Sequence, residues 1–225
     1  MKSRKATNAS QTMTDTSNPR STKIRLDEET CVFNEHLRID RYQLTHKRYD
    51  GDWSRLIQRE VMSRRNAAAV LLFDPYRQEV LLIEQFRIGA WVAGEASPWL
   101  LECVAGLVEE GEDAEEVAIR ETLEEAGCSL IRLMPIAKYL TTPGCSSEQV
   151  KLFCGQIDAT GAGGYYGVDE EDEDICANVW SIDDALQLLD DGKICNSMTI
   201  IALQWLALHH VTLTTHWITN TNWSP

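Results

Sequence analysis

The sequence lacks a surplus of basic residues and has no long apolar run. Its 35 acidic and 21 basic residues give a formal net charge of −14, so the basic footprint of duplex-binding proteins is missing. The same acidity disfavours binding to an anionic membrane surface. No run of about 18 apolar residues occurs, which argues against a membrane-spanning helix. We therefore expect neither nucleic acid nor a membrane as a partner.

The cysteines argue against a zinc site or a disulfide framework. They number 7, which is odd, and no two have C-x-x-C spacing. Free, buried thiols in a reducing compartment are the better interpretation, so we expect a cytoplasmic protein. The first 23 residues are rich in Ser, Thr and Asn, carry a basic surplus and lack the apolar segment of a secretory signal. A transit peptide has a similar composition, but no apolar helical face is visible, and we predict a disordered tail.

The length fits one large domain, or one domain with a smaller appendage, and the 44% hydrophobic content is that of a globular protein with a core. After the predicted tail of residues 1–23, strand-like stretches with short polar breaks predict a small N-terminal β-unit over residues 24–62. We expect the main domain over residues 63–215 and a tail over residues 216–225.

Apolar runs and turn signals predict alternating strands and helices in the main domain. Residues 158–174 are rich in glycine and then strongly acidic, so we expect a loop there. Mixed strands with three helices indicate an α/β or α+β sandwich. The expected strands span residues 67–73, 79–86, 100–105, 131–141, 149–157 and 175–180, and the expected helices span 113–126, 181–191 and 197–211.

The helix predicted over residues 113–126 carries the most acidic side chains. Asp113 followed by Glu116 has the form of a capping box, and Gly127 fits the position after the helix. At about 100° per residue, an apolar stripe of roughly 140° forms, with Glu121 and Glu125 at its border. The stripe contains Ala118, Ile119, Thr122, Leu123 and Ala126.

Two carboxylates one helical turn apart repel each other, so a positive group is expected between Glu121 and Glu125. Hard divalent cations bind oxygen ligands, and Mg²⁺ is typically held by a few carboxylates together with substrate phosphates. A solvated acidic helix face explains the glutamates equally well when they are considered alone. The spacing of the residues around the helix favours the metal site.

Residues 106–128 resemble the Nudix box, G-x5-E-x7-R-E-U-x-E-E-x-G-U. Thr122 and Cys128 occupy the two positions at which the family prefers an aliphatic residue, and both are small and semi-apolar. The resemblance implies a Nudix-type α/β/α sandwich with a mixed sheet and a small N-terminal antiparallel β-unit. Every fixed Gly, Glu and Arg of the motif is present, as Gly106, Glu112, Arg120, Glu121, Glu124, Glu125 and Gly127.

The resemblance also implies roles for these residues. Glu121 and Glu125 would bind Mg²⁺, with Mn²⁺ as an alternative ion, together with the carbonyl of Ala105. Glu124 would be a further ligand or would contact a metal-bound water. Glu112 and Arg120 would hold the loop to the helix through a salt bridge rather than act on substrate.

Outside the motif, the sequence is similar to the ADP-ribose pyrophosphatase branch of the family. Residues 83–87 and 98–106 are similar to that branch, and Pro143 lies sixteen residues after Gly127, which is a mark of it. The branch implies hydrolysis of ADP-ribose to AMP and ribose 5-phosphate. Hydrolysis of another nucleoside diphosphate sugar, or a non-catalytic module that binds ADP-ribose, are the alternatives.

The acidic segment 169–174 would supply further carboxylates. Alone it would be a solvated loop, but beside a metal helix a carboxylate-bearing loop provides both a ligand and a base. The branch has two glutamates here, two positions apart. They correspond to Glu171 as the general base and Glu173 as a third metal-binding carboxylate, with Glu170 and Asp172 as close alternatives.

Substrate contacts are carried over from the branch position by position. A diphosphate needs guanidinium or ammonium partners. His36 stands where related proteins have an aromatic ring, which leaves the adenine-stacking partner open. The branch also implies a homodimer in which the N-terminal β-unit of one chain completes the site of the other. The implied substrate-binding residues are His36, Leu37, Arg59, Glu60, Arg64, Arg87, Leu107, Thr142, Pro143, Gly144 and Glu148.

Overall fold

The computed structural model describes residues 22–168 and 172–220. They form two compact units that divide between Met62 and Ser63, and each is described by itself. Most of the predicted N-terminal tail and the predicted base Glu171 lie outside the described residues.

The first unit is a three-stranded antiparallel sheet, as expected for the small N-terminal β-unit. Its strands are β1 (Ile24–Asn34), β2 (Arg38–His46) and β3 (Ile57–Met62), in the order β1-β2-β3. Trp53 lies in the β2–β3 connection, and the guanidinium of Arg25 lies 3.8 Å from the centre of its ring. This cation–π contact packs β1 against the β2–β3 connection.

The second unit is built on an eight-stranded mixed sheet with a continuous path of β10-β11-β5-β4-β9-β8. Within the described residues only β4 and β9 pair in parallel, and β6 and β7 pair with β5 and β4 beside that path. The strands are β4 (Ala67–Asp74), β5 (Glu79–Phe86), β6 (Trp99–Glu102), β7 (Val104–Leu107), β8 (Arg132–Leu140), β9 (Gln149–Gln156), β10 (Gly164–Tyr166) and β11 (Ile175–Ser181).

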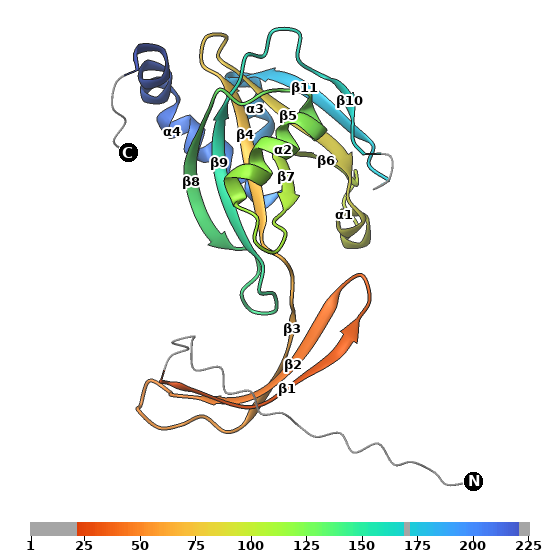
Figure 1. Cartoon of the computed structure of the whole chain (residues 1–225), viewed down its shortest axis with the longest axis vertical. Helices are drawn as coiled ribbons and strands as arrows, with labels where there is room; N and C mark the ends of the chain where they lie inside the picture. Colours follow the sequence, from red (N-terminus) through yellow and green to blue (C-terminus); the bar gives the residue numbers. More distant parts are fainter. Residues whose placement is uncertain (1–21, 169–171, 221–225) are drawn as a thin grey trace, which may run out of the picture. The chain divides into compact units, whose positions relative to one another are not determined.

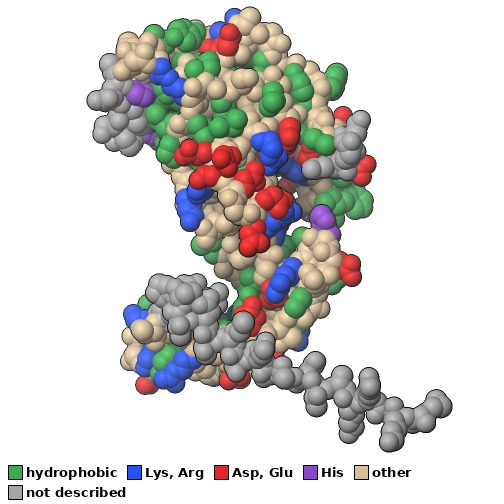
Figure 2. Space-filling model, in the orientation of Figure 1, with side chains coloured by type: hydrophobic (Ala, Val, Ile, Leu, Met, Phe, Trp, Pro, Cys, Tyr) green, Lys and Arg blue, Asp and Glu red, His purple; other side chains and the backbone are tan. Residues whose placement is uncertain are grey.

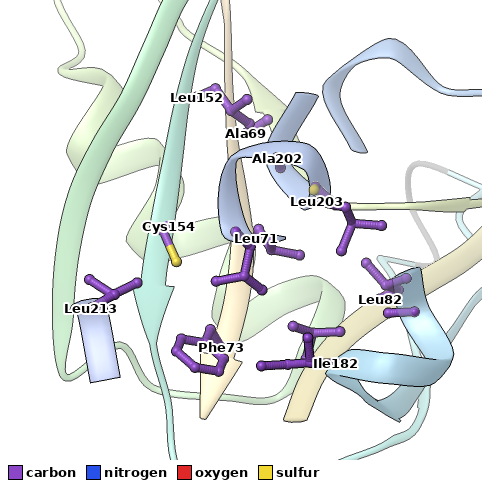
Figure 3. Close-up of a cluster of buried hydrophobic side chains, with 14 of the residues drawn as sticks. Ala69, Leu71, Phe73, Leu82, Leu152, Cys154, Ile182, Ala202, Leu203 and Leu213 are labelled. Carbon is purple, nitrogen blue, oxygen red and sulfur yellow. The ribbon is translucent and has the colours of Figure 1, made fainter. Parts of the chain in front are cut away.

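Helices cover both faces of this sheet, which confirms the predicted α/β/α sandwich (Figure 1). The helix α2 (Ala114–Ala126) packs on one face, and α3 (Ile182–Asp190) and α4 (Ser197–Thr219) pack on the other. Strand β4 is buried on both faces, because successive side chains point to opposite sides. Figure 3 shows Leu71 and Phe73 of β4 in one buried cluster with Ile182 of α3 and Leu203 of α4.

Four parts of the second unit differ from the prediction. The single strand expected over residues 100–105 is divided at Cys103 into β6 and β7, because the chain changes its pairing there from β5 to β4. A short helix α1 (Ile88–Ala93) and the strand β10 were not predicted, and β10 lies in the segment expected to be a loop. Helix α4 continues to Thr219, past the expected domain end at residue 215, because Trp217 is buried and its ring lies 6.0 Å from that of Phe73. None of the described helices is long and apolar enough to cross a membrane.

All of the cysteines are free, as expected. The expectation that they are buried holds only in part, since Cys31, Cys145 and Cys195 are exposed.

Replacing the buried ring at the end of α4 tests whether this last segment belongs to the core. Trp217→Ala should lower the free energy of unfolding by about 3 kcal/mol, the usual cost of truncating a buried large aromatic side chain. Ile218→Ala, at an exposed neighbouring position, should cost no more than about 0.5 kcal/mol. Urea unfolding of both variants measures the difference, and equal small losses would show that α4 is not part of the core beyond residue 215.

Candidate active site

Helix α2 positions the acidic side chains, and its ends are fixed as the sequence predicted. The Asp113 carboxylate accepts a hydrogen bond from the Glu115 N–H at 3.0 Å, and the Glu116 carboxylate accepts one from the Asp113 N–H at 3.5 Å. Gly127 ends the helix in the left-handed conformation, with φ of 61°. These caps fix the first and last residues of α2.

The buried face of α2 differs from the predicted apolar stripe. Ile119 and Leu123 are 55% and 60% exposed, whereas Glu125 is only 2% exposed. The helix packs on the sheet mainly through small side chains such as Ala114, Ala118 and Ala126, which allow a close approach that Ile119 and Leu123 would prevent. Glu125 therefore lies near the middle of the buried face rather than at its border.

Glu125 and Glu121 lie against strand β7. The Glu125 carboxylate accepts a hydrogen bond from the Ala105 N–H at 3.0 Å. A Cβ atom on Gly106 would overlap the carboxylate of Glu121, so the strand has room for this side chain only because residue 106 is glycine. The structure thus brings together Glu121, Glu125 and the backbone of Ala105, the predicted metal ligands.

The carboxylates of Glu121, Glu125 and Glu173 lie near one another, and positively charged side chains neutralise them only in part. Burial, helped by the nearby carboxylates of Glu121 and Glu173, raises the pKa of Glu125 to about 8, although the Ala105 N–H and Arg87 act to lower it. Burial also raises the pKa of Glu121, which Arg120 opposes. Acidic side chains gather on the face of the unit that α2 covers (Figure 2).

Arg120 neutralises part of this charge. Its Nη1 lies 2.7 Å from Oε1 of Glu121 and 3.0 Å from Oε2 of Glu124, and its Nε lies 3.6 Å from Oε1 of Glu112. The expected contact between Arg120 and Glu112, from helix to loop, is therefore present. Glu124 is more exposed than Glu121 and Glu125, which fits an outer position in the cluster.

Arg87 is held by a buried glutamate that the sequence did not single out. Its Nε donates to Oε2 of Glu102 at 2.8 Å, and Glu102 is 1% exposed. The other oxygen of Glu102 accepts from Asn196 at 2.7 Å. A glutamate at the end of an apolar strand was the one signal in the sequence, and nothing in the sequence pointed to its pairing with Arg87 or Asn196.

Exposed apolar side chains lie on both sides of Arg87 in the sequence. The rings of Phe86 and Trp99 meet edge to face with centroids 5.6 Å apart, and α1 adds Trp91 and Val92, which are also exposed. The sequence did not reveal these exposed side chains because α1 was not predicted.

The remaining predicted residues of the second unit lie on loops and strand ends. Thr142, Pro143 and Gly144 form a turn in which the Thr142 carbonyl accepts from the Ser146 N–H at 2.9 Å. Glu148 follows this turn, and its Oε1 lies 3.6 Å from Nε of Arg64. Leu107 ends β7 and is the register partner of Ala67.

Glu173 lies close enough to influence both Glu121 and Glu125, and one of its oxygens accepts from the Val168 N–H at 3.3 Å. His36, Leu37, Arg59 and Glu60 belong to the first unit. There Glu60 pairs with Arg41 at 3.0 Å, and Arg59 donates to the Gln58 carbonyl. Their predicted contacts with substrate are therefore not tested by this geometry.

A family model described as the NUDIX domain matches residues 62–223. The chain belongs to the Nudix family. An ADP-ribose pyrophosphatase of Escherichia coli (strain K12) is 46% identical over 194 residues, which cover 86% of this chain and 92% of that protein. One from Haemophilus influenzae is 39% identical over 196 residues, covering 86% and 90%. The predicted similarity to the ADP-ribose pyrophosphatase branch is confirmed.

Two further comparisons concern a relative named for another substrate and a solved structure. A GDP-mannose pyrophosphatase of Cronobacter sakazakii is 36% identical over 177 residues, covering 78% of this chain and 89% of that protein. A crystal structure titled as an ADP compounds hydrolase has a TM-score of 0.60 at 20% identity and covers 83% of this chain and 96% of its own. At that identity it supports the Nudix fold alone.

The residues of this Nudix site fit a divalent cation. Oxygen donors dominate, and the buried pair Glu121 and Glu125 lacks a full set of positive partners, which a bound cation would supply. Over residues 22–168 and 172–220, no three His, Cys, Asp or Glu side chains converge into a preformed metal group. The pair together with a backbone carbonyl and substrate phosphates matches the sparse protein coordination that Mg²⁺ uses.

The pKa of Glu125 predicts how the metal-free protein responds to pH. A carboxyl group with a pKa near 8 in the folded state and 4.5 in the unfolded state binds more protons when folded, so stability falls as pH rises between these values. In the presence of a chelator, Glu125→Gln should therefore be more stable than the unchanged protein at about pH 8.5. The gain should be on the order of a few kcal/mol, since one pKa unit corresponds to about 1.4 kcal/mol.

Thermal unfolding at about pH 5 and about pH 8.5 measures this effect. At the lower pH the two proteins should agree, because Glu125 is then protonated in the folded state. Glu115→Gln, at an exposed position on the same helix, is the control and should show no such pH dependence. A Glu125→Gln protein no more stable at high pH than the original would refute the burial of an uncompensated carboxylate.

Proposed function

We propose that this protein hydrolyses the pyrophosphate bond of ADP-ribose with Mg²⁺, adding one water and releasing AMP and ribose 5-phosphate. The observation that carries the proposal is the under-neutralised carboxylate pair of Glu125, which is buried on the Ala105 N–H, and the half-buried Glu121 one turn away. The similarity over most of the chain to proteins named ADP-ribose pyrophosphatase supports the choice of substrate.

Mg²⁺, or Mn²⁺ in its place, would be held by Glu121, Glu125 and the Ala105 carbonyl, with Glu124 and Glu173 as further carboxylates. When bound, the ion neutralises diphosphate charge and lowers the pKa of a coordinated water. For this to happen Arg120 has to share or release Glu121, which it now contacts at 2.7 Å. Arg120 thus offsets part of the negative charge of Glu121 and Glu124.

Arginines of the second unit would bind the phosphates. Arg87 is oriented by the buried Glu102, which fixes its guanidinium close to Glu125. Arg64, paired with Glu148, would contact the substrate beside the turn of Thr142, Pro143 and Gly144. Leu107 would lie behind the diphosphate.

The acidic segment would supply the base. We assign Glu171 to take the proton from the attacking water, because Glu173, two positions on, already lies near the carboxylate pair. Adenine contacts would come from His36, Leu37, Arg59 and Glu60 of the first unit, contributed by the partner chain of a homodimer. We further propose that the enzyme works in the cytoplasm, where its free thiols would stay reduced.

A second candidate substrate class is another nucleoside diphosphate sugar. The similarity to a GDP-mannose pyrophosphatase favours it specifically, although at 36% rather than 46% identity. A module that binds ADP-ribose without cleaving it is less well supported, because every carboxylate of the motif is present.

A substrate panel tests the proposed activity. With Mg²⁺, ADP-ribose should be cleaved to AMP and ribose 5-phosphate, with a kcat/KM above those for GDP-mannose and UDP-glucose. Glu121→Gln should lose at least about 100-fold in kcat, because the cluster loses a charged oxygen donor. The control Glu115→Gln should keep near-normal activity. A higher kcat/KM for GDP-mannose would favour another nucleoside diphosphate sugar as the substrate. If none of the substrates in the panel were cleaved, catalysis would be refuted.

Changing the proposed base gives a separate test. Glu171→Gln should reduce kcat by about 10²–10⁴-fold, the usual share of a general base. Glu170→Gln, one position away, should have a small effect. The opposite ranking in single-turnover measurements would transfer the role to Glu170.

A further inference from the structure

Two lysines stand directly opposite each other on neighbouring strands. Lys138 of β8 and Lys151 of β9 are register partners in an antiparallel pair. Val150 and Leu152, on either side of Lys151, are buried in the core under α3 and α4. Because side chains alternate along a strand, Lys151 and its partner Lys138 point to the other face, which α2 covers. Like charges placed opposite each other in this way destabilise a sheet.

Neither lysine is compensated by a carboxylate. Among the residues described, no ion pair or side-chain hydrogen bond involves Lys138 or Lys151, although acidic residues outnumber basic ones by 35 to 21 in the chain. Every arginine of the second unit, in contrast, is engaged by a protein oxygen. These arginines are Arg64, Arg65, Arg77, Arg87, Arg120 and Arg132. The lysine pair is thus an unusual concentration of unpaired positive charge.

The two lysines line a cavity of about 190 Å³ beside the loop that precedes α2. Asn66, Val108, Ala114 and Gln149 also line it. The side-chain oxygen of Asn66 accepts from the Gln149 N–H at 3.2 Å, which leaves the amide hydrogens of Asn66 as donors. The cavity therefore combines two ammonium groups with a neutral donor.

Two acidic residues reach the same cavity, but their carboxylates have other partners. Glu112 faces Arg120 at 3.6 Å and accepts from the Glu109 N–H at 3.1 Å. Asp113 caps α2 by accepting from the Glu115 N–H at 3.0 Å. Neither carboxylate lies within ion-pair distance of the lysines, so the positive charge of the pair is left for another group.

We propose that Lys138 and Lys151 bind the phosphate group of a small anionic ligand in this cavity. An anion with several oxygens can accept from both ammonium groups at once and removes the repulsion between them. The cavity has room for a phosphate or a compact phosphate ester. The residues that line this cavity do not include Glu121, Glu124 or Glu125. Phosphate binding here therefore does not depend on the proposed hydrolysis. The backbone carbonyl of Asn66 accepts from the Val108 N–H at 2.8 Å, so Asn66 would link the ligand to the loop that leads to α2.

Phosphate-dependent stability of the metal-free protein tests this site. In the presence of a chelator, inorganic phosphate at ten times its dissociation constant should shift the unfolding equilibrium of the unchanged protein by about elevenfold toward the folded state. The double variant Lys138→Gln/Lys151→Gln should lose most of this shift. Lys193→Gln, at another exposed lysine of the unit, is the matched control and should retain it.

The outcomes separate the sources of the effect. A larger shift with glycerol 3-phosphate than with inorganic phosphate would support a phosphate ester as the ligand, and equal shifts would support phosphate itself. An equal shift in all three proteins would place phosphate elsewhere and overturn the proposal, as would no shift in the unchanged protein. Without phosphate the double variant should unfold no more easily than the original, because its opposed charges are gone.

Discussion

The contact between Glu125 and the Ala105 N–H is the constraint on which the site depends. It draws a carboxylate into the middle of the face that α2 presents to the sheet, at 2% exposure. That position requires the helix to approach β7 closely, which its alanines permit, and it requires glycine at residue 106 to make room for Glu121. The strand, the glycine and the helix therefore form one structural unit, and the rest of the sandwich holds it in place.

Burying carboxylates without matching cations is unfavourable, and the structure concentrates this cost in one place. Glu102, the other buried glutamate of the second unit, is matched by Arg87. At the cluster, Arg120 reaches Glu121 and Glu124, while Glu125 remains with a pKa near 8. A locally unfavourable arrangement inside an otherwise consistent fold is typical of a functional site.

The sequence predicted the sandwich and both ends of α2, since capping residues and apolar periodicity act locally. It misplaced the buried face of α2, because a count of apolar residues favours Ile119 and Leu123 while close packing favours the alanines. The support of Arg87 by Glu102 and Asn196 could not be predicted, since these residues are far apart in sequence and meet only through the fold. Helix α1 and strand β10 are too short to give a periodic signal.

The central claim is that the buried carboxylate pair is a cation site. Calorimetric titration of Mg²⁺ into the substrate-free protein tests this most directly, with Glu125→Gln and Glu115→Gln compared under the same conditions. Our account predicts that Glu125→Gln weakens Mg²⁺ binding by at least about tenfold, or about 1.4 kcal/mol, while Glu115→Gln binds as the unchanged protein does. Equal affinities of Glu125→Gln and the unchanged protein would contradict it.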